Sequence, residues 1–146
     1  LSSAGASQPH RHMQLLRRSN NDDICPRCYW FNNLIEEEGN KKIAVSGSSC
    51  VVKITKGNFN ELTLYNYYLR CSATMGLGDP ENNIKPSKPY NLLICNQWIA
   101  LIIRSKEQYK GFNINALGFA GYLMATEDSH IKWLNKFGPE NLLENV

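Results

Sequence analysis

Alternating and clustered apolar positions predict strands in the early part of the chain. Pro9 to Leu16 alternates polar and mixed side chains after a small polar loop, which predicts a short strand. Ile43–Val45 and Cys50–Ile54 are two apolar runs separated by the turn-forming residues Ser46–Ser49. This arrangement predicts a β-hairpin.

The segments between these strands are polar. Residues 17–27 and 32–42 are rich in charged, Asn and Asp side chains, which predicts surface connections on either side of the aromatic patch Tyr29–Phe31. This patch and the cluster Tyr65–Tyr68 could stack on a nucleobase, but aromatic clusters of this kind more often belong to the core. We therefore favour a core role for both.

A second hairpin is predicted in the middle of the chain. Tyr90–Cys95 and Trp98–Arg104 are β-rich apolar runs on either side of Asn96-Gln97, so we predict two largely buried strands joined by a two-residue turn. The preceding segment, Gly78 to Pro89, contains three prolines and is expected to be a loop. If the chain has an internal boundary, we expect it in this loop.

Helical periodicity is clearest from Phe59 to Met75. Asn58 or Asn60 can cap the start of this helix, and Gly76 can end it. Glu127 to Phe137 is predicted as a second helix closed by Gly138-Pro139, and Glu140 to Val146 as a short final helix. The apolar positions expected to face the core in the first helix are Leu62, Tyr65, Leu69 and Ala73.

Composition is that of an ordinary soluble protein. The chain has 146 residues, 42% of them hydrophobic and 20% charged, with a net charge of +3. This small positive excess suits an anionic small molecule, and we expect neither a nucleic-acid partner nor a membrane partner. Leu1 stands where a complete chain has Met, and the first residues lack the features of a secretory signal. Five cysteines at irregular spacing favour a reducing, cytoplasmic setting.

The segment most informative about chemistry contains two of the three histidines. On a strand, His10, His12 and Gln14 would project from one face, because side chains two residues apart point the same way. Just upstream, Gly5-Ala6-Ser7 can form a nest of backbone N–H groups for phosphate oxygens, with Ser7 and Gln8 adding side-chain donors. A bound phosphate would then lie close to the histidines.

The two histidines and the cysteine pair also have simpler interpretations. A His-x-His pair alone is more often a solvated strand or a chance metal binder. Cys25-x-x-Cys28 could hold zinc only with two further ligands, and Cys50, Cys71 and His130 stand at no recognisable spacing for that role. We therefore expect no zinc site.

The histidine segment resembles the transferase branch of the histidine-triad superfamily, in which His-x-His-x-Gln replaces His-x-His-x-His. Within that branch, Gly5 to Gln14 is similar to the diadenosine tetraphosphate phosphorylases, also called ATP adenylyltransferases. A second resemblance to the same family lies in Lys88 to Leu93, Trp98, Arg104-Ser105 and Asn113 to Gly121. The resemblance implies an α+β fold with a histidine-triad-like antiparallel sheet, flanking helices and the histidine motif on one strand.

The resemblance also implies a reaction. His12 would attack the α-phosphorus of diadenosine tetraphosphate and become adenylyl-histidine, ATP would leave, and inorganic phosphate would release ADP. His10 would polarise the site, and Gln14 would hold a phosphoryl oxygen, since an amide donates hydrogen bonds but cannot shuttle protons. No metal is expected as a required cofactor, although magnesium could accompany the polyphosphate. A hydrolase is disfavoured by Gln14.

Further substrate contacts are implied for the C-terminal region. Asn113, Ile114, Asn115 and Tyr122 would approach the nucleotide. Some members of the family carry a lysine beyond the glycine of this segment, where this chain has Ala125-Thr126.

The resemblance implies a division at residue 84. Residues 1–84 would be the C-terminal part of the histidine-triad-like catalytic domain, and residues 85–146 the ATP adenylyltransferase C-terminal region. The chain is thus expected to correspond to the C-terminal half of the enzyme. The alternative function is a truncated, non-catalytic nucleotide-binding remnant.

Overall fold

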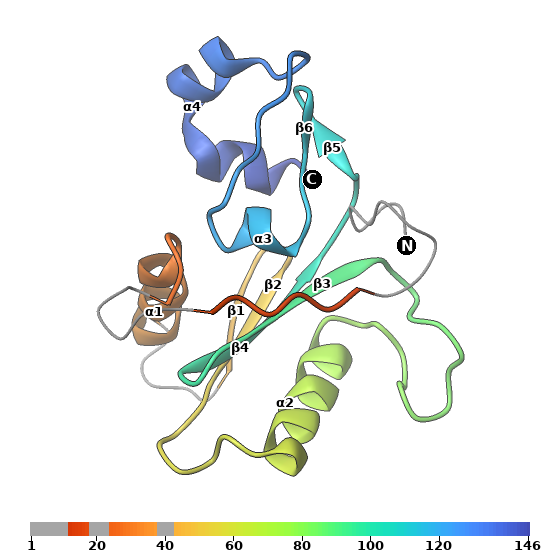
Figure 1. Ribbon diagram of the computed structural model, residues 1–146. Helices are drawn as coiled ribbons and strands as arrows, with labels where there is room; N and C mark the ends of the chain where they lie inside the picture. Colours follow the sequence, from red (N-terminus) through yellow and green to blue (C-terminus); the bar gives the residue numbers. More distant parts are fainter. Residues whose placement is uncertain (1–11, 18–23, 38–42) are drawn as a thin grey trace. The chain divides into compact units, whose positions relative to one another are not determined.

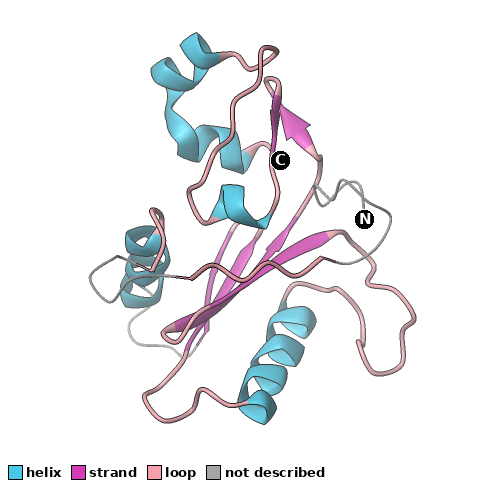
Figure 2. Cartoon of the chain, viewed as in Figure 1, coloured by secondary structure: helices cyan, strands magenta, loops and turns pink. Residues whose placement is uncertain are grey.

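A computed structural model describes residues 12–17, 24–37 and 43–146 of the chain (Figure 1). It contains two compact units, one of Leu1–Arg27 with Arg104–Val146 and the other of Cys28–Ile103. Helices and strands are both present, and the strands pair antiparallel (Figure 2). The predicted α+β class is therefore confirmed.

The second unit is built on a four-stranded antiparallel sheet. Its strand order is β1-β2-β4-β3. Both predicted hairpins are confirmed, because β1 pairs with β2 and β3 pairs with β4. The strands are β1 (Ile43–Ser46), β2 (Ser49–Lys53), β3 (Tyr90–Ile94) and β4 (Trp98–Ile103).

The two hairpins are joined through β2 and β4. Val51 lies opposite Ala100 in this pairing, and Cys50 lies opposite Leu101. The first five residues of β4 are buried, whereas β3 is half-buried and ends at the exposed Ile94. The prediction that both strands are largely buried was wrong for β3, because β3 is an edge strand with a neighbour on one side only.

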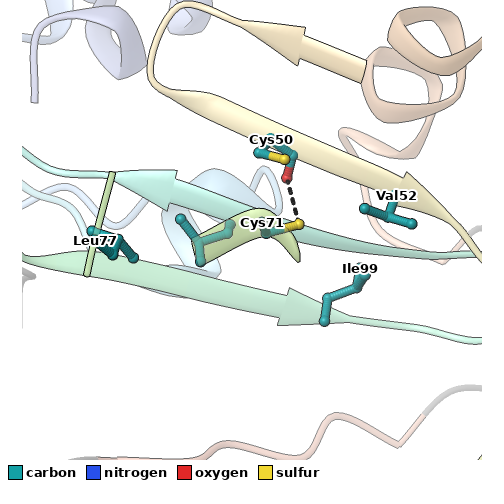
Figure 3. Close-up of a cluster of buried hydrophobic side chains, with 6 residues drawn as sticks. Cys50, Val52, Cys71, Leu77 and Ile99 are labelled. Atoms are coloured by element: carbon teal, nitrogen blue, oxygen red, sulfur yellow. Dashed lines mark hydrogen bonds between the residues drawn. The ribbon is translucent and has the colours of Figure 1, made fainter. Parts of the chain in front are cut away.

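One face of the sheet packs against α2 (Glu61–Thr74). Figure 3 shows Cys50, Val52 and Ile99 from the sheet together with Cys71 and Leu77. The Cys71 thiol lies 3.9 Å from the backbone oxygen of Cys50. A hydrogen bond with the Cys50 thiol and burial both raise the pKa of Cys71, so this thiol stays neutral in the core.

Helix α2 starts as predicted but presents a different face. The Asn60 side chain accepts a hydrogen bond from the Thr63 backbone N–H at 3.0 Å, which is an N-cap contact. The predicted core stripe was wrong, because Leu62 is 67% exposed and Ala73 is also exposed. The buried residues of α2 are Cys71 and Ser72, and Tyr67 and Tyr68 pack against the buried cluster that contains Cys71.

The opposite face of the sheet carries helix α1 (Cys28–Glu37). The sequence did not predict this helix, because the residues around it are polar. Phe31 is fully buried and stacks on Trp98 of β4, with ring centroids 4.3 Å apart. Residues 32–37 are thus helical rather than a surface connection. The core role expected for the aromatic patch is confirmed for Phe31, while Tyr29 is 76% exposed.

The described residues of the other unit form a small hairpin and two helices. Lys110 and Gly111 form the hairpin turn, both with positive φ. Gly138 interrupts α4 with non-helical angles, so two helical segments meet there, as the Gly138-Pro139 pair predicts. The first segment begins at Ile131 rather than at Glu127. The elements are β5 (Gln108–Tyr109), β6 (Phe112–Asn113), α3 (Ala116–Phe119) and α4 (Ile131–Glu144).

Two further expectations differ from the structure. Residues 12–16 adopt no regular secondary structure, so the predicted strand is wrong for this described part of Pro9–Leu16. The loop Gly78–Pro89 lies inside one compact unit, because β3 and β4 join the sheet of β1 and β2. The boundary between the compact units therefore lies outside this loop, and the division of the family's regions at residue 84 stays a prediction. Within the described residues, no helix combines the length and apolar character needed to cross a membrane.

Candidate functional site

His12 and Gln14 lie in an exposed, irregular segment of residues 12–17. Met13, between them, is 88% exposed, and Leu15 is 91% exposed. The imidazole and the amide are thus on the solvent side of the chain, where a substrate can reach them. The remaining predicted residues of this motif, Gly5, Ala6, Ser7, Gln8 and His10, lie outside the described residues.

The second predicted segment follows strand β6. Asn113 is exposed at the end of the strand, whereas Ile114 is only 1% exposed. Asn115 caps α3, because its side-chain oxygen accepts hydrogen bonds from the backbone N–H groups of Leu117 at 2.9 Å and Gly118 at 3.2 Å. The side chain of Ile114 is thus out of reach of a ligand, and its backbone N–H donates to the backbone oxygen of Glu107 at 3.0 Å. The side-chain oxygen of Asn115 is engaged within the chain.

Arg104 supports this segment from the interior. Its Nη1 donates to the backbone oxygen of Ile114 at 2.8 Å, and its Nη2 donates to that of Lys106 at 2.6 Å. The guanidinium carbon also lies 5.1 Å from the centroid of the Phe119 ring. Burial lowers the pKa of Arg104 to about 10, partly offset by the charge of Glu107, so the group remains cationic at neutral pH.

Arg27 holds the far end of the same segment. Its Nε and Nη2 donate to the two carboxylate oxygens of Glu140, at 2.8 and 2.6 Å. Its Nη1 donates to the backbone oxygen of Phe119 at 3.0 Å, and its own backbone N–H donates to that of Ala120 at 3.1 Å. A bidentate ion pair thus ties α4 to the end of α3.

Gly121 is required where the segment ends. Its φ is +103°, and a Cβ at this position would lie 2.7 Å from Cβ of Pro26 and 3.0 Å from the backbone nitrogen of Arg27. A side chain here would collide with Pro26 and Arg27, so the close approach of the two backbones needs a glycine. The next residue, Tyr122, is 43% exposed, and its backbone N–H donates to the backbone oxygen of Leu117.

The cysteine pair shows no metal-binding arrangement among the described residues. All five cysteines are free thiols. No cluster of three His, Cys, Asp or Glu side chains forms in residues 12–17, 24–37 and 43–146, and so none forms around Cys25 and Cys28.

Comparison of the sequence with models of known protein families identifies the family of this chain. The sequence model of the ATP adenylyltransferase C-terminal domain matches residues 12–146. The chain belongs to the ATP adenylyltransferase C-terminal domain family. The match begins at His12 and covers Gln14, Arg27, Arg104 and the segment Asn113–Tyr122.

Solved structures support the same fold. The chain is similar to the crystal structure of yeast Ap4A phosphorylase Apa2, with a TM-score of 0.67 and 20% sequence identity. The likeness covers 98% of this chain and 52% of the yeast protein, so the chain spans about half the length of that relative. Among curated proteins, none matches the sequence. The predicted resemblance to the ATP adenylyltransferase family is confirmed, and so is the predicted α+β fold with an antiparallel sheet and flanking helices.

Sequence reasoning missed the residues that hold the family's C-terminal segment in place. Arg104 was noticed only as part of the resemblance, and its burial beneath Ile114 was not foreseen. The ion pair of Arg27 with Glu140 joins residues 113 positions apart, and both occur in polar stretches typical of solvated surface. Their sequence context carries no signal for this pairing.

Proposed function

We propose that the chain is the C-terminal half of a nucleotidyltransferase that cleaves diadenosine tetraphosphate with inorganic phosphate to give ATP and ADP. The match of residues 12–146 to the ATP adenylyltransferase C-terminal domain is the observation that carries this proposal. The substrates would be diadenosine polyphosphates, ATP, ADP and phosphate. The five free thiols fit the reducing cytoplasm that we expect for it.

His12 is the proposed nucleophile. The unprotonated nitrogen of its neutral imidazole attacks the α-phosphorus, the bond from that phosphorus to the bridging oxygen breaks, and ATP leaves with the oxygen. An oxygen of inorganic phosphate then attacks the adenylyl-histidine, the phosphorus–nitrogen bond breaks, and ADP leaves. The exposure of His12 supports the proposal, because both the dinucleotide and phosphate must reach the same nitrogen.

Gln14, His10 and the nest would assist the transfer. The Gln14 amide would donate a hydrogen bond to a phosphoryl oxygen whose negative charge grows in the transition state. His10 would polarise the site, and the backbone N–H groups of Gly5, Ala6 and Ser7, with the Gln8 side chain, would hold the remaining phosphates. None of these groups needs a metal, and magnesium would enter only with the polyphosphate.

The segment after β6 would bind the nucleotide. Asn113 is exposed, and the Asn115 amide nitrogen remains as a donor while its oxygen caps α3. Tyr122 offers a half-exposed ring. Ile114 would contribute at most the second lone pair of its backbone oxygen, since its side chain is buried and its backbone N–H donates to Glu107. Arg104 and Arg27 would keep this segment in position without touching the substrate.

The test is the isolation of the covalent intermediate. The chain is incubated with diadenosine tetraphosphate in the absence of phosphate, and intact mass is measured for the wild type and for H12A. The expected result is an AMP-sized adduct on the wild type alone, released as ADP when phosphate is added. Q14A serves as a control that keeps the nucleophile and should slow adduct formation without abolishing it.

A non-catalytic nucleotide-binding remnant is the second candidate. The observation in its favour is that the chain spans only 52% of the yeast relative, so cationic groups from the remaining length could be needed for transfer. Binding without an adduct, measured by calorimetry with diadenosine tetraphosphate, would favour the remnant. An adduct on H12A equal to that on the wild type would exclude His12 as the nucleophile.

A further inference from the structure

Three aromatic side chains form a partly exposed row, which we call the aromatic row, from Tyr109, Trp133 and Phe137. Tyr109 and Trp133 meet edge to face with ring centroids 5.4 Å apart, and Trp133 stacks on Phe137 at 5.1 Å. Phe137 is 48% exposed, while Tyr109 and Trp133 are half-buried. The proposed adenylyl transfer makes no use of these rings.

Three lysines place their ammonium groups over the aromatic row. The Nζ of Lys106 lies 5.2 Å from the Tyr109 centroid, and the Nζ of Lys136 lies 5.1 Å from the Phe137 centroid. The Nζ of Lys110 lies between two rings, 5.6 Å from Tyr109 and 5.9 Å from Trp133. In the described part of the chain, none of the three lysines forms an ion pair, so no described carboxylate neutralises their charges.

The aromatic row is held by a fixed scaffold. The hairpin turn at Lys110-Gly111 contacts the start of α4, because the Ser129 hydroxyl donates to the backbone oxygen of Gly111 at 2.9 Å. The backbone N–H of His130 donates to the backbone oxygen of Lys110 at 3.0 Å. These bonds hold Tyr109 on the hairpin beside Trp133 on the helix. The rings are therefore arranged before any partner arrives.

We propose that the aromatic row and its three lysines bind single-stranded nucleic acid. The exposed part of the Phe137 ring can stack on any base, and the flexible ammonium groups over the rings can turn to the neighbouring phosphates; stacking combined with positive charge is how proteins bind single strands without reading their sequence. An exposed ring with three lysines around it matches a polymer of bases and phosphates better than one free nucleotide. A double helix presents an unstacked base to the aromatic row only at its ends.

The composition of the chain does not reveal this local cluster of positive charge. The 16 basic residues are spread over the whole chain, and the net charge is only +3. This small net charge predicts no nucleic-acid partner. The fold gathers three of those lysines around three aromatic rings in one unit. Local charge density beside stacking surfaces, not net charge, is what a single strand meets.

Fluorescence anisotropy of a labelled twelve-nucleotide oligothymidylate tests the proposal, using the full chain at low salt. F137L should weaken binding about tenfold, since the loss of one base–ring stack corresponds to roughly that factor. K136A should also weaken binding and should lower the slope of log affinity against log salt by about 0.7, the value for one phosphate contact on a single strand. F137Y keeps the ring and should bind as the wild type does.

K132A is the matched control. Lys132 is exposed on the same helix and has no ring contact among the described residues, so this variant removes the same charge away from the aromatic row. Its affinity should stay within about twofold of the wild type. Equal losses in K132A and K136A would overturn the proposal, because binding would then follow diffuse charge.

Three further results would also overturn it: no binding by the wild type, equal affinity for a duplex of the same length, or equal competition by ATP at the same phosphate concentration. The last result would indicate a free-nucleotide site. Thermal unfolding of each variant, followed by circular dichroism, checks that lost affinity is not lost folding. H12A should bind oligothymidylate normally, so the outcome does not depend on the proposed transfer reaction.

Discussion

Replacing Gly111 by alanine should lower the free energy of unfolding by about 3–4 kcal/mol. The φ of Gly111 is +76°, where an L-residue costs about 1–2 kcal/mol. A Cβ would lie 2.0 Å from the backbone oxygen of Asp128, so the loop before α4 must move away. That movement breaks the hydrogen bonds from Ser129 to Gly111 and from His130 to Lys110, each worth about 1 kcal/mol.

The control is G76A. The φ of Gly76 is +65°, and no atom lies within 4 Å of the position its Cβ would take. This variant therefore carries the backbone cost alone, about 1–2 kcal/mol. Urea unfolding followed by far-ultraviolet circular dichroism measures both variants, with the denaturant slope m required to match the wild type. If G111A and G76A were equally destabilised, the contact with Asp128 would relax at no cost and the reasoning would be refuted.

Two further substitutions test single contacts. N60A should lower the free energy of unfolding by about 1 kcal/mol, because it removes the N-cap of α2, whereas N60D keeps an acceptor and should restore most of the loss; urea unfolding measures both. E140Q should lower the free energy of unfolding by about 1 kcal/mol. The effect is this small because the Glu140 side chain is 46% exposed and solvent screens its ion pair with Arg27. A double-mutant cycle with R27Q should give a coupling of similar size, and a coupling near zero would contradict the structural role assigned to this pair.

Local signals in the sequence predicted the parts of the fold that local chemistry decides. The turn-forming residues at 46–49 and the pair Asn96-Gln97 fix both hairpins, because a short turn sets the register of the strands beside it. Asn60 and the Gly138-Pro139 pair mark a helix start and a kink for the same reason. These features depend on neighbours a few positions away.

Features set by distant neighbours were not predictable in this way. The face of α2 that meets the sheet carries Cys71 with Tyr67 and Tyr68 rather than Leu62, because contacts with distant strands, not the local spacing of apolar residues, decide which face is covered. Helix α1 was missed because Phe31 finds its partner, Trp98, far along the chain. The candidate site divides likewise: the sequence indicated His12 and Asn115, while the supporting arginines become visible only in three dimensions.

The strand order β1-β2-β4-β3 has a consequence for how the chain is made. Each hairpin can form as soon as its own residues are available, but β2 pairs with β4, and this contact closes a loop containing the whole of α2 and the proline-rich segment. Loop closure over such a separation is slow compared with hairpin formation. During synthesis, the edge of β2 that pairs with β4 therefore remains unpaired until Ile103 has left the ribosome, and an unpaired strand edge in that interval favours aggregation.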